Sequence, residues 1–242
     1  MKENNSFLWG VRDGIPICLG YLSVSFAFGI LATSLGLSIL ETTLISLFNM
    51  TSAGQLAAVP IIASLGSYLE LALSQLVINL RYALMSVSLS QKLGNSVKFC
   101  DRFAFAFVNT DEVFAVATGR PDAVGRHYMY GLIFTPVIGW TTGTALGAIA
   151  GNILPPIAIS ALGIAIYAMF VAIVTPGVMA QGSTAVLVLL SAILSSIFYY
   201  TPFLRENIQS GFVIIICAAI ASCALAILAP VPDEPEEVAN AA

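Results

Sequence analysis

Three charged side chains stand in stretches that are otherwise apolar. Arg81 lies within "SQLVINLRYALMSV", and the acids Asp111 and Glu112 lie within "FAFAFVNTDEVFAVATG". An arginine halfway along a membrane helix costs about 2.5–3.5 kcal/mol to insert, so Arg81 needs a partner of opposite charge. Adjacent helical residues point about 100° apart. We therefore expect one of the two acids to pair with Arg81 and the other to be free to carry a proton.

Polar residues surround Arg81 at helical spacing. Gln75, Asn79 and Tyr82 are separated by four and three positions and therefore share one helical face. A polar stripe of this kind is expected to face the interior of a helix bundle. A purely structural ion pair that fixes helix register is the alternative interpretation of Arg81 and its acid.

The composition indicates what kind of chain positions these residues. Of the 242 residues, 58% are hydrophobic and 9% are charged. Soluble domains carry roughly a quarter charged residues, so we predict an all-α, polytopic membrane helix bundle. A bilayer core needs about 20 apolar residues per helix. About six to eight hydrophobic segments approach that length; the candidates are residues 14–34, 42–63, 67–90, 103–118, 130–150, 156–174, 185–200 and 211–228.

Two of these segments make poor spanning helices. The segment at residues 42–63 carries Asn49, Thr51, Ser52, Gly54 and Gln55 at membrane depth. The segment at residues 103–118 is short and polar in its middle. Irregular backbone at that depth is tolerated only where protein encloses it or where it lines a wet cavity. We therefore predict broken or re-entrant helices near residues 48–56 and 103–118, which is typical of a transporter's binding site.

The placement of Lys and Arg gives an independent test of re-entrance. If every segment crossed the membrane once, the basic residues of flanks and loops would divide evenly between the two sides. If one early segment and residues 103–118 are re-entrant, Arg205 alone falls on the far side, and one side receives Lys2, Arg12, Lys92, Lys98, Arg102, Arg120 and Arg126. The positive-inside rule favours this second arrangement, with both termini cytoplasmic.

The expected domain organisation follows from these segments. Residues 1–13 form a cytoplasmic N-terminal segment, residues 14–229 form a transmembrane transporter domain, and residues 230–242 form a disordered acidic tail. Glycines at 139, 143, 147 and 151 recur every fourth residue, which brings one helix face close to a neighbouring backbone. Packing within this chain and docking of a partner subunit are the two interpretations of that ladder.

Several other functions are disfavoured. The chain has no basic stripe interleaved with aromatic residues, so nucleic-acid binding is not expected. Its four cysteines form no CxxC pair and it has a single histidine, so no metal site or cofactor is expected. Motifs of zincins, P-loop proteins, dinucleotide folds and nucleophile elbows are missing, so we do not expect an enzyme.

Three short motifs stand in order along the chain. They are "TSAGQ" from Thr51, "NLR" ending at Arg81, and "TDE" ending at Glu112, with Phe114 two positions on. With these motifs as its most specific parts, the chain resembles, over about residues 10–230, the AzlC family of branched-chain amino-acid exporters. The resemblance implies the large subunit of a two-component permease in the bacterial inner membrane, which works with a small AzlD-type membrane subunit.

The hypothesis that follows is a secondary transporter that exports a branched-chain or similar small hydrophobic amino acid in exchange for protons. Arg81, Asp111 and Glu112 would form the charge pair and the proton-coupling group. Apolar contacts to the substrate side chain are expected from Phe48, Met50 and Phe114. The predicted substrate-binding residues are Asn49, Thr51, Ser52, Gly54, Gln55, Gln75, Asn79 and Phe114. The alternative is an uncoupled, channel-like facilitator or a structural membrane component.

Overall fold

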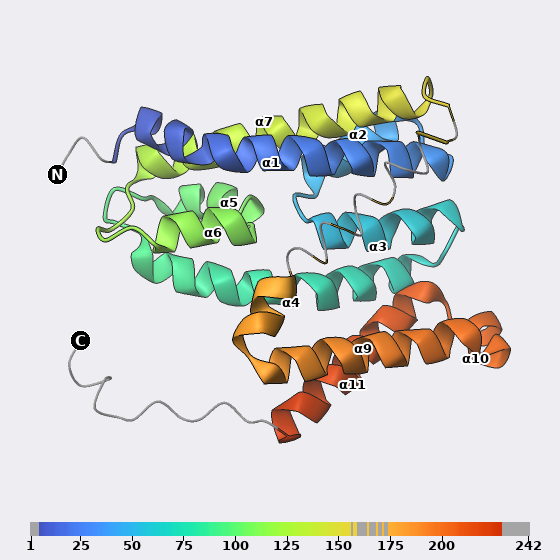
Figure 1. Cartoon of the computed structure of the whole chain (residues 1–242). Helices are drawn as coiled ribbons and strands as arrows, with labels where there is room; N and C mark the ends of the chain where they lie inside the picture. Colours follow the sequence, from blue (N-terminus) through green and yellow to red (C-terminus); the bar gives the residue numbers. More distant parts are fainter. Residues whose placement is uncertain are drawn as a thin grey trace. The chain divides into compact units, whose positions relative to one another are not determined.

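The structure, a computed structural model, describes residues 5–155, 157–158, 164, 168, 171 and 174–228 (Figure 1). Within these ranges every regular element is a helix, and one isolated bridge joins Leu93 to Val124. The predicted all-α class is therefore confirmed. Most of the predicted segment 156–174, and the tail at 230–242, lie outside the described residues.

The chain divides into two compact units, Met1–Phe170 and Val171–Ala242, which we describe separately. The first unit contains α1 (Phe7–Ser34), α2 (Ile39–Phe48), α3 (Ser52–Ala63), α4 (Tyr68–Lys92), α5 (Phe99–Phe107), α6 (Asp111–Thr118) and α7 (Arg126–Gly151). The second contains α9 (Gly182–Tyr200), α10 (Pro202–Asn207) and α11 (Ser210–Leu228), and α9 packs against α11. Four described helices, namely α1, α4, α7 and α9, are long and apolar enough to cross a membrane.

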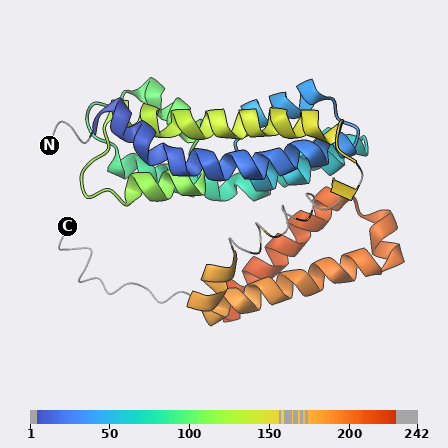
Figure 2. The same ribbon diagram turned by 45° about the horizontal axis from the view of Figure 1, so that its top comes forward.

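Glycines let α1 and α7 lie against each other along most of their lengths (Figure 2). A methyl group built on Gly147 would lie 1.9 Å from the carbonyl oxygen of Phe26, and one on Gly139 would lie 2.4 Å from that of Cys18. Gly10 and Gly29 of α1 face the backbone of α7 just as closely. The glycine ladder is therefore a packing surface within this chain. Its interpretation as a docking face for a partner subunit is wrong, because α1 already covers it.

The substitution Gly147→Ala is expected to destabilise the protein. Because the added methyl group meets backbone rather than a mobile side chain, α1 and α7 must separate, and overpacking of this kind costs about 1–3 kcal/mol. Thermal unfolding in detergent should show a lower midpoint. Gly20→Ala is the matched control, because Gly20 is also inside a long helix, α1, but a methyl group there has no neighbouring atom within 4 Å. An equal loss in both variants would contradict the packing argument.

At each of the two predicted breaks the chain forms a helical hairpin. The second helix of each hairpin finishes at the same end of the first unit at which its first helix starts. Gly36, Glu41 and Ala63 line one hollow beside the end of α1, so α2 starts and α3 finishes at that end. At the opposite end, Asn5 bonds to Ala123 and Gly125, and Arg126 of α7 reaches Asp101 of α5. The hairpin α2–α3 and the hairpin α5–α6 therefore approach the middle of the unit from opposite ends (Figure 1). Broken helices at both predicted places are confirmed.

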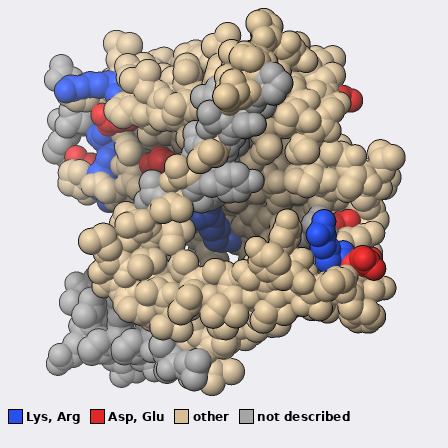
Figure 3. Space-filling view, turned by 45° about the vertical axis from the view of Figure 1, so that its right-hand side comes forward, with Lys and Arg blue, Asp and Glu red and all other residues tan. Residues whose placement is uncertain are grey.

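Basic residues gather at the end of the first unit where α1 starts. Arg120 pairs with Asp13 at 3.4 Å, and Arg126 pairs with Asp101 at 3.0 Å. The pKa of Asp101 is raised by burial, but hydrogen bonds from the Lys98 amide, Tyr130 and Arg126 hold it below its ordinary value. The described basic residues at this end are Arg12, Lys92, Lys98, Arg102, Arg120 and Arg126. Figure 3 shows charged side chains gathered at its left edge, beside a wide surface of other residues.

Candidate functional site

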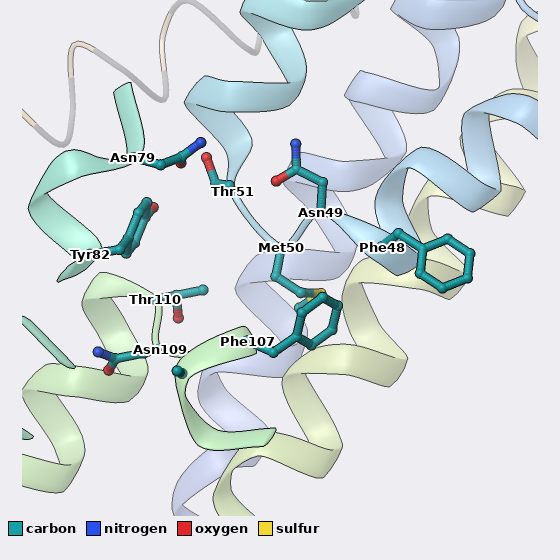
Figure 4. Close-up of a pocket in the computed structure, with 10 residues that line it drawn as sticks. Phe48, Asn49, Met50, Thr51, Asn79, Tyr82, Phe107, Asn109 and Thr110 are labelled. Carbon is teal, nitrogen blue, oxygen red and sulfur yellow. The ribbon is translucent and has the colours of Figure 1, made fainter. Parts of the chain in front are cut away.

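The two interrupted hairpins meet at a cavity of about 180 Å³ in the first unit. Each hairpin contributes its interruption, residues 49–51 in one and 108–110 in the other, and α4 closes the side (Figure 4). The lining consists of Phe48, Asn49, Met50, Thr51, Asn79, Tyr82, Ala106, Phe107, Asn109 and Thr110. The cavity therefore lies where two helices end, at Phe48 and Phe107, and two helices begin, at Ser52 and Asp111.

Threonines restart both helices after the interruptions. The Thr51 hydroxyl accepts the amide hydrogen of Gly54 at 2.9 Å, and the Thr110 hydroxyl accepts that of Val113 at 3.5 Å. Threonine is a favoured N-cap because its side chain satisfies one of the amides that a helix start leaves without an acceptor. The amides of the first turn carry partial positive charge. Both helix starts therefore bring positive potential to the cavity.

The two helix starts differ in how that potential is balanced. The first turn of α6 contains Asp111 and Glu112, whereas the first turn of α3 contains no acidic residue. Carboxylates near a helix start offset its partial charge. The positive end of α6 is therefore balanced within the chain, and the positive end of α3 is not.

Two amides predicted to bind substrate hold the first hairpin in shape. Gln55 is fully buried and donates from Nε2 to the carbonyl of Asn49 at 2.7 Å and to the hydroxyl of Ser46 at 3.0 Å. Gln75 of α4 donates from Nε2 to the carbonyl of Gly54 at 2.8 Å. Gly54 fits there because a side chain would clash with Gln75 and Thr51. Neither glutamine is part of the cavity lining.

Arg81 makes an ion pair with Asp111. The distance from Arg81 Nη2 to Asp111 Oδ2 is 2.8 Å, and Arg81 also donates to the Tyr82 hydroxyl at 3.2 Å. The side chains of Arg81 and Asp111 are 52% and 47% exposed in the isolated chain. The pair links the middle of α4 to the first residue of α6, so it fixes the second interruption beside the polar stripe of α4.

Glu112 has a different partner. It accepts a hydrogen bond from the hydroxyl of Tyr21, which is buried on α1 and packs edge-on against Trp140 with ring centroids 5.1 Å apart. Among the described residues Glu112 makes no ion pair. The two adjacent acids therefore differ, because one is bound to a cation and the other to a neutral hydroxyl.

The predicted residues are thus divided between the cavity and its supports. Asn49, Thr51 and Asn79 line the cavity, together with Phe48 and Met50. Ser52 lines a separate narrow void with Gln55 and Trp140. Phe114 packs against the hydrophobic core on α6. Arg81, Asp111 and Glu112 lie next to the lining residues without being part of the lining.

Other lining residues were not in the predicted set. Tyr82 belongs to the same stripe as Asn79, and Asn109 and Thr110 are the polar residues of the second interruption, so their spacing could have identified them. Ala106 and Phe107 could not have been identified from the sequence, because they belong to an apolar run in which nothing distinguishes them from their neighbours. Tyr21 had no signal either, since a tyrosine in an apolar segment is commonly a packing or interfacial residue.

Comparisons with known proteins agree with this architecture. The chain matches the family described as "AzlC protein" over residues 16–154, which include α2–α6 and both interruptions. It is 29% identical over 236 residues to "Inner membrane protein YgaZ" of Escherichia coli (strain K12), an alignment that covers 95% of this chain and 94% of that protein. It is 34% identical over 178 residues to "Uncharacterized membrane protein" of Archaeoglobus fulgidus, covering 73% of this chain and 78% of that protein.

No solved structure matches the chain significantly. The family match covers more than half of the sequence, and the matched relatives are named as membrane proteins. With its apolar helices, the protein is therefore a multi-pass membrane protein. The chain belongs to the AzlC family.

Proposed function

We propose that this protein is a secondary transporter that exports branched-chain or similar small hydrophobic amino acids in exchange for protons. The observation that carries the proposal is the cavity at which two helices end and two begin. Interrupted helices of this kind offer partial positive and partial negative charge at one place, which suits a zwitterion.

The start of α3 is the proposed site for the substrate carboxylate. The amides of Ser52 and Ala53 lie in the first turn, where helix geometry provides no acceptor for them, and the Thr51 hydroxyl is adjacent. No acidic residue of that turn competes for the positive end. A carboxylate placed there would receive charge-assisted hydrogen bonds, which are about twice as strong as neutral ones.

The size and the apolar part of the cavity favour a small hydrophobic substrate. A water molecule needs roughly 10–15 Å³. The cavity of about 180 Å³ therefore has room for a molecule the size of an amino acid. Phe48, Met50 and Phe107 provide apolar surface for its side chain, and Figure 4 places Met50 next to Phe107.

The remaining parts of the proposal concern orientation and partners. Basic residues lie at the end where α1 starts, so the positive-inside rule favours the cytoplasmic side of a bacterial inner membrane for that end and for the N-terminus. The cytoplasmic placement of the C-terminus is proposed on the charge count of the sequence. A small AzlD-type membrane subunit is proposed as the partner.

Cells loaded with a leucine-containing dipeptide test the transport activity. Cells that express the chain together with its small subunit should release leucine faster than cells with an empty vector, because hydrolysis of the dipeptide raises the internal leucine concentration. Cells loaded with a glutamate dipeptide are the specificity control. Equal leucine release with and without the chain would contradict the proposal.

Proton coupling separates the exporter from an uncoupled facilitator. In proteoliposomes, an imposed pH gradient should drive leucine against its concentration gradient, and a protonophore should abolish that accumulation. The charged groups Asp111 and Glu112 beside the cavity favour coupling. Leucine flux that is indifferent to the pH gradient would instead support the facilitator.

A further inference from the structure

Asn79, a residue of the cavity lining, carries a hydrogen-bond acceptor that is not used. Its Nδ2 donates to Gln75 Oε1 at 3.2 Å, while its Oδ1 is buried and has no hydrogen-bond partner in the structure. Buried acceptors without a donor are rare, because each costs about 1–3 kcal/mol. An orphaned oxygen in a cavity lining is therefore a reason to look for a ligand that donates to it.

The orientation of the Asn79 carboxamide is fixed by a relay that starts at the backbone. The carbonyl of Gly54 can only accept, so Gln75 must turn its Nε2 toward it. Gln75 Oε1 then faces Asn79 and can only accept, so Asn79 must turn its Nδ2 toward Gln75. The carbonyl oxygen of Asn79 is left as the group that faces away from the relay.

Asn79 also lies beside the positive start of α3. Figure 4 shows Asn79 and Thr51 next to each other, with the amide nitrogen of Asn79 as its end nearer to Thr51, whereas the carboxamide of Asn109 is turned away from Thr51. Asn109 donates to Ser86 of α4 at 3.1 Å. An α-amino acid carries its ammonium and carboxylate on one carbon atom, so an acceptor for the ammonium must lie next to the donors for the carboxylate. Asn79 and Thr51 line the same cavity, so one small substrate can contact both.

We propose that Asn79 Oδ1 receives the ammonium group of the substrate and that Gln75 is the positioning residue that aims it. The inference rests on the proposed function and adds a specificity rule to it. The site binds α-amino acids and discriminates against α-keto acids of the same shape, because a keto acid cannot donate to the buried oxygen.

The test compares leucine with α-ketoisocaproate, which has the same side chain and carboxylate but no ammonium. Binding is measured by titration of the full-length chain in lipid nanodiscs. The wild type is expected to prefer leucine by about 10- to 100-fold, the range for one buried hydrogen bond to a charged group. In Asn79→Leu that preference should fall to within a few-fold of unity, because leucine binds more weakly and the keto acid does not.

Matched variants separate this rule from general damage to the cavity. Asn109→Leu makes the same change at another lining asparagine, whose Oδ1 is also buried without a partner but whose carboxamide is turned away from Thr51. It is expected to affect both ligands alike, so the preference is retained. Gln75→Met keeps Asn79 but frees its carboxamide to turn, so the preference should fall part of the way. If Asn79→Leu has a lowered melting temperature or fails to fold, Asn79→Ala removes the same acceptor with a small residue that membrane helices tolerate well.

The outcomes distinguish the inference from the function on which it rests. If the wild type binds leucine and Asn79→Leu or Asn79→Ala keeps the full preference over the keto acid, the role of Asn79 is wrong and the amino-acid exporter stands. If Asn109→Leu, and not the Asn79 variant, loses the preference for leucine over the keto acid, the role proposed for Asn79 is also wrong. If the wild type binds neither ligand, the proposed function itself is wrong, and the inference is wrong with it.

Discussion

Asp111→Asn is expected to abolish export and to lower the amount of folded protein, whereas Arg81→Leu is expected to abolish export and leave the fold in place. The reason is the chemistry of the two partners, which lie 2.8 Å apart. Without Asp111, the Arg81 guanidinium remains charged at any accessible pH in the middle of a membrane-spanning helix, which costs about 2.5–3.5 kcal/mol or more. Without Arg81, Asp111 can take up a proton and become neutral.

Both variants should lose export because the pair joins α4 to the first residue of α6. A displacement of about 1 Å at a binding site can reduce a rate roughly 100-fold. The measurements are leucine efflux from dipeptide-loaded cells and the yield of monodisperse protein in detergent. Arg102→Ala is the control, since Arg102 is exposed and makes no described ion pair.

The double variant Arg81→Leu/Asp111→Leu sharpens the same prediction. Replacing both members of an ion pair by apolar residues is commonly neutral for stability, whereas removal of one member is not. We expect the yield of folded protein to recover relative to Asp111→Asn and export to stay absent. Normal export in the double variant would show that the pair serves stability alone, which is the structural interpretation raised by the sequence.

The sequence predicts the long helices and both interruptions because each depends on local properties. Runs of apolar residues determine α1, α4 and α7, and polar residues at membrane depth mark the two places where α3 and α6 begin. The polar stripe of α4 follows from helical periodicity alone, and two of its members, Asn79 and Tyr82, line the cavity.

What the sequence cannot predict is how distant elements are arranged. Asp111 and Glu112 are adjacent and chemically alike, so the residue that meets Arg81 depends on where α6 begins and how it is rotated. Whether a polar residue lines the cavity or holds the hairpins around it also depends on that arrangement. The sequence predicts Gln55 as a substrate ligand, and the structure shows that its side-chain amide donates to the backbone carbonyl of Asn49. The glycines of α7 were compatible with packing within this chain or with docking of a partner subunit. The contact between α7 and α1 shows that the first interpretation is the right one.

Glu112 is the group that we expect to carry the proton. Asp111 is occupied by Arg81, whereas Glu112 accepts from the neutral Tyr21 hydroxyl and can be protonated without breaking an ion pair. Glu112→Gln keeps the size of the side chain and removes its ability to lose a proton. The variant should therefore still exchange labelled for unlabelled leucine across proteoliposomes, but an imposed pH gradient should no longer drive accumulation.

Tyr21→Phe tests whether the hydrogen bond positions the carboxylate. The phenyl ring should keep its packing against Trp140, so the fold is retained, and the carboxylate loses its donor. We expect slower transport, by about 10-fold for one lost hydrogen bond to a charged group, with pH-driven accumulation still present. Glu206→Gln makes the same change as Glu112→Gln at an exposed acid of α10 and should leave coupling intact. If Glu112→Gln still accumulates leucine in response to the pH gradient, the proton is carried elsewhere, and Asp111 becomes the group to test.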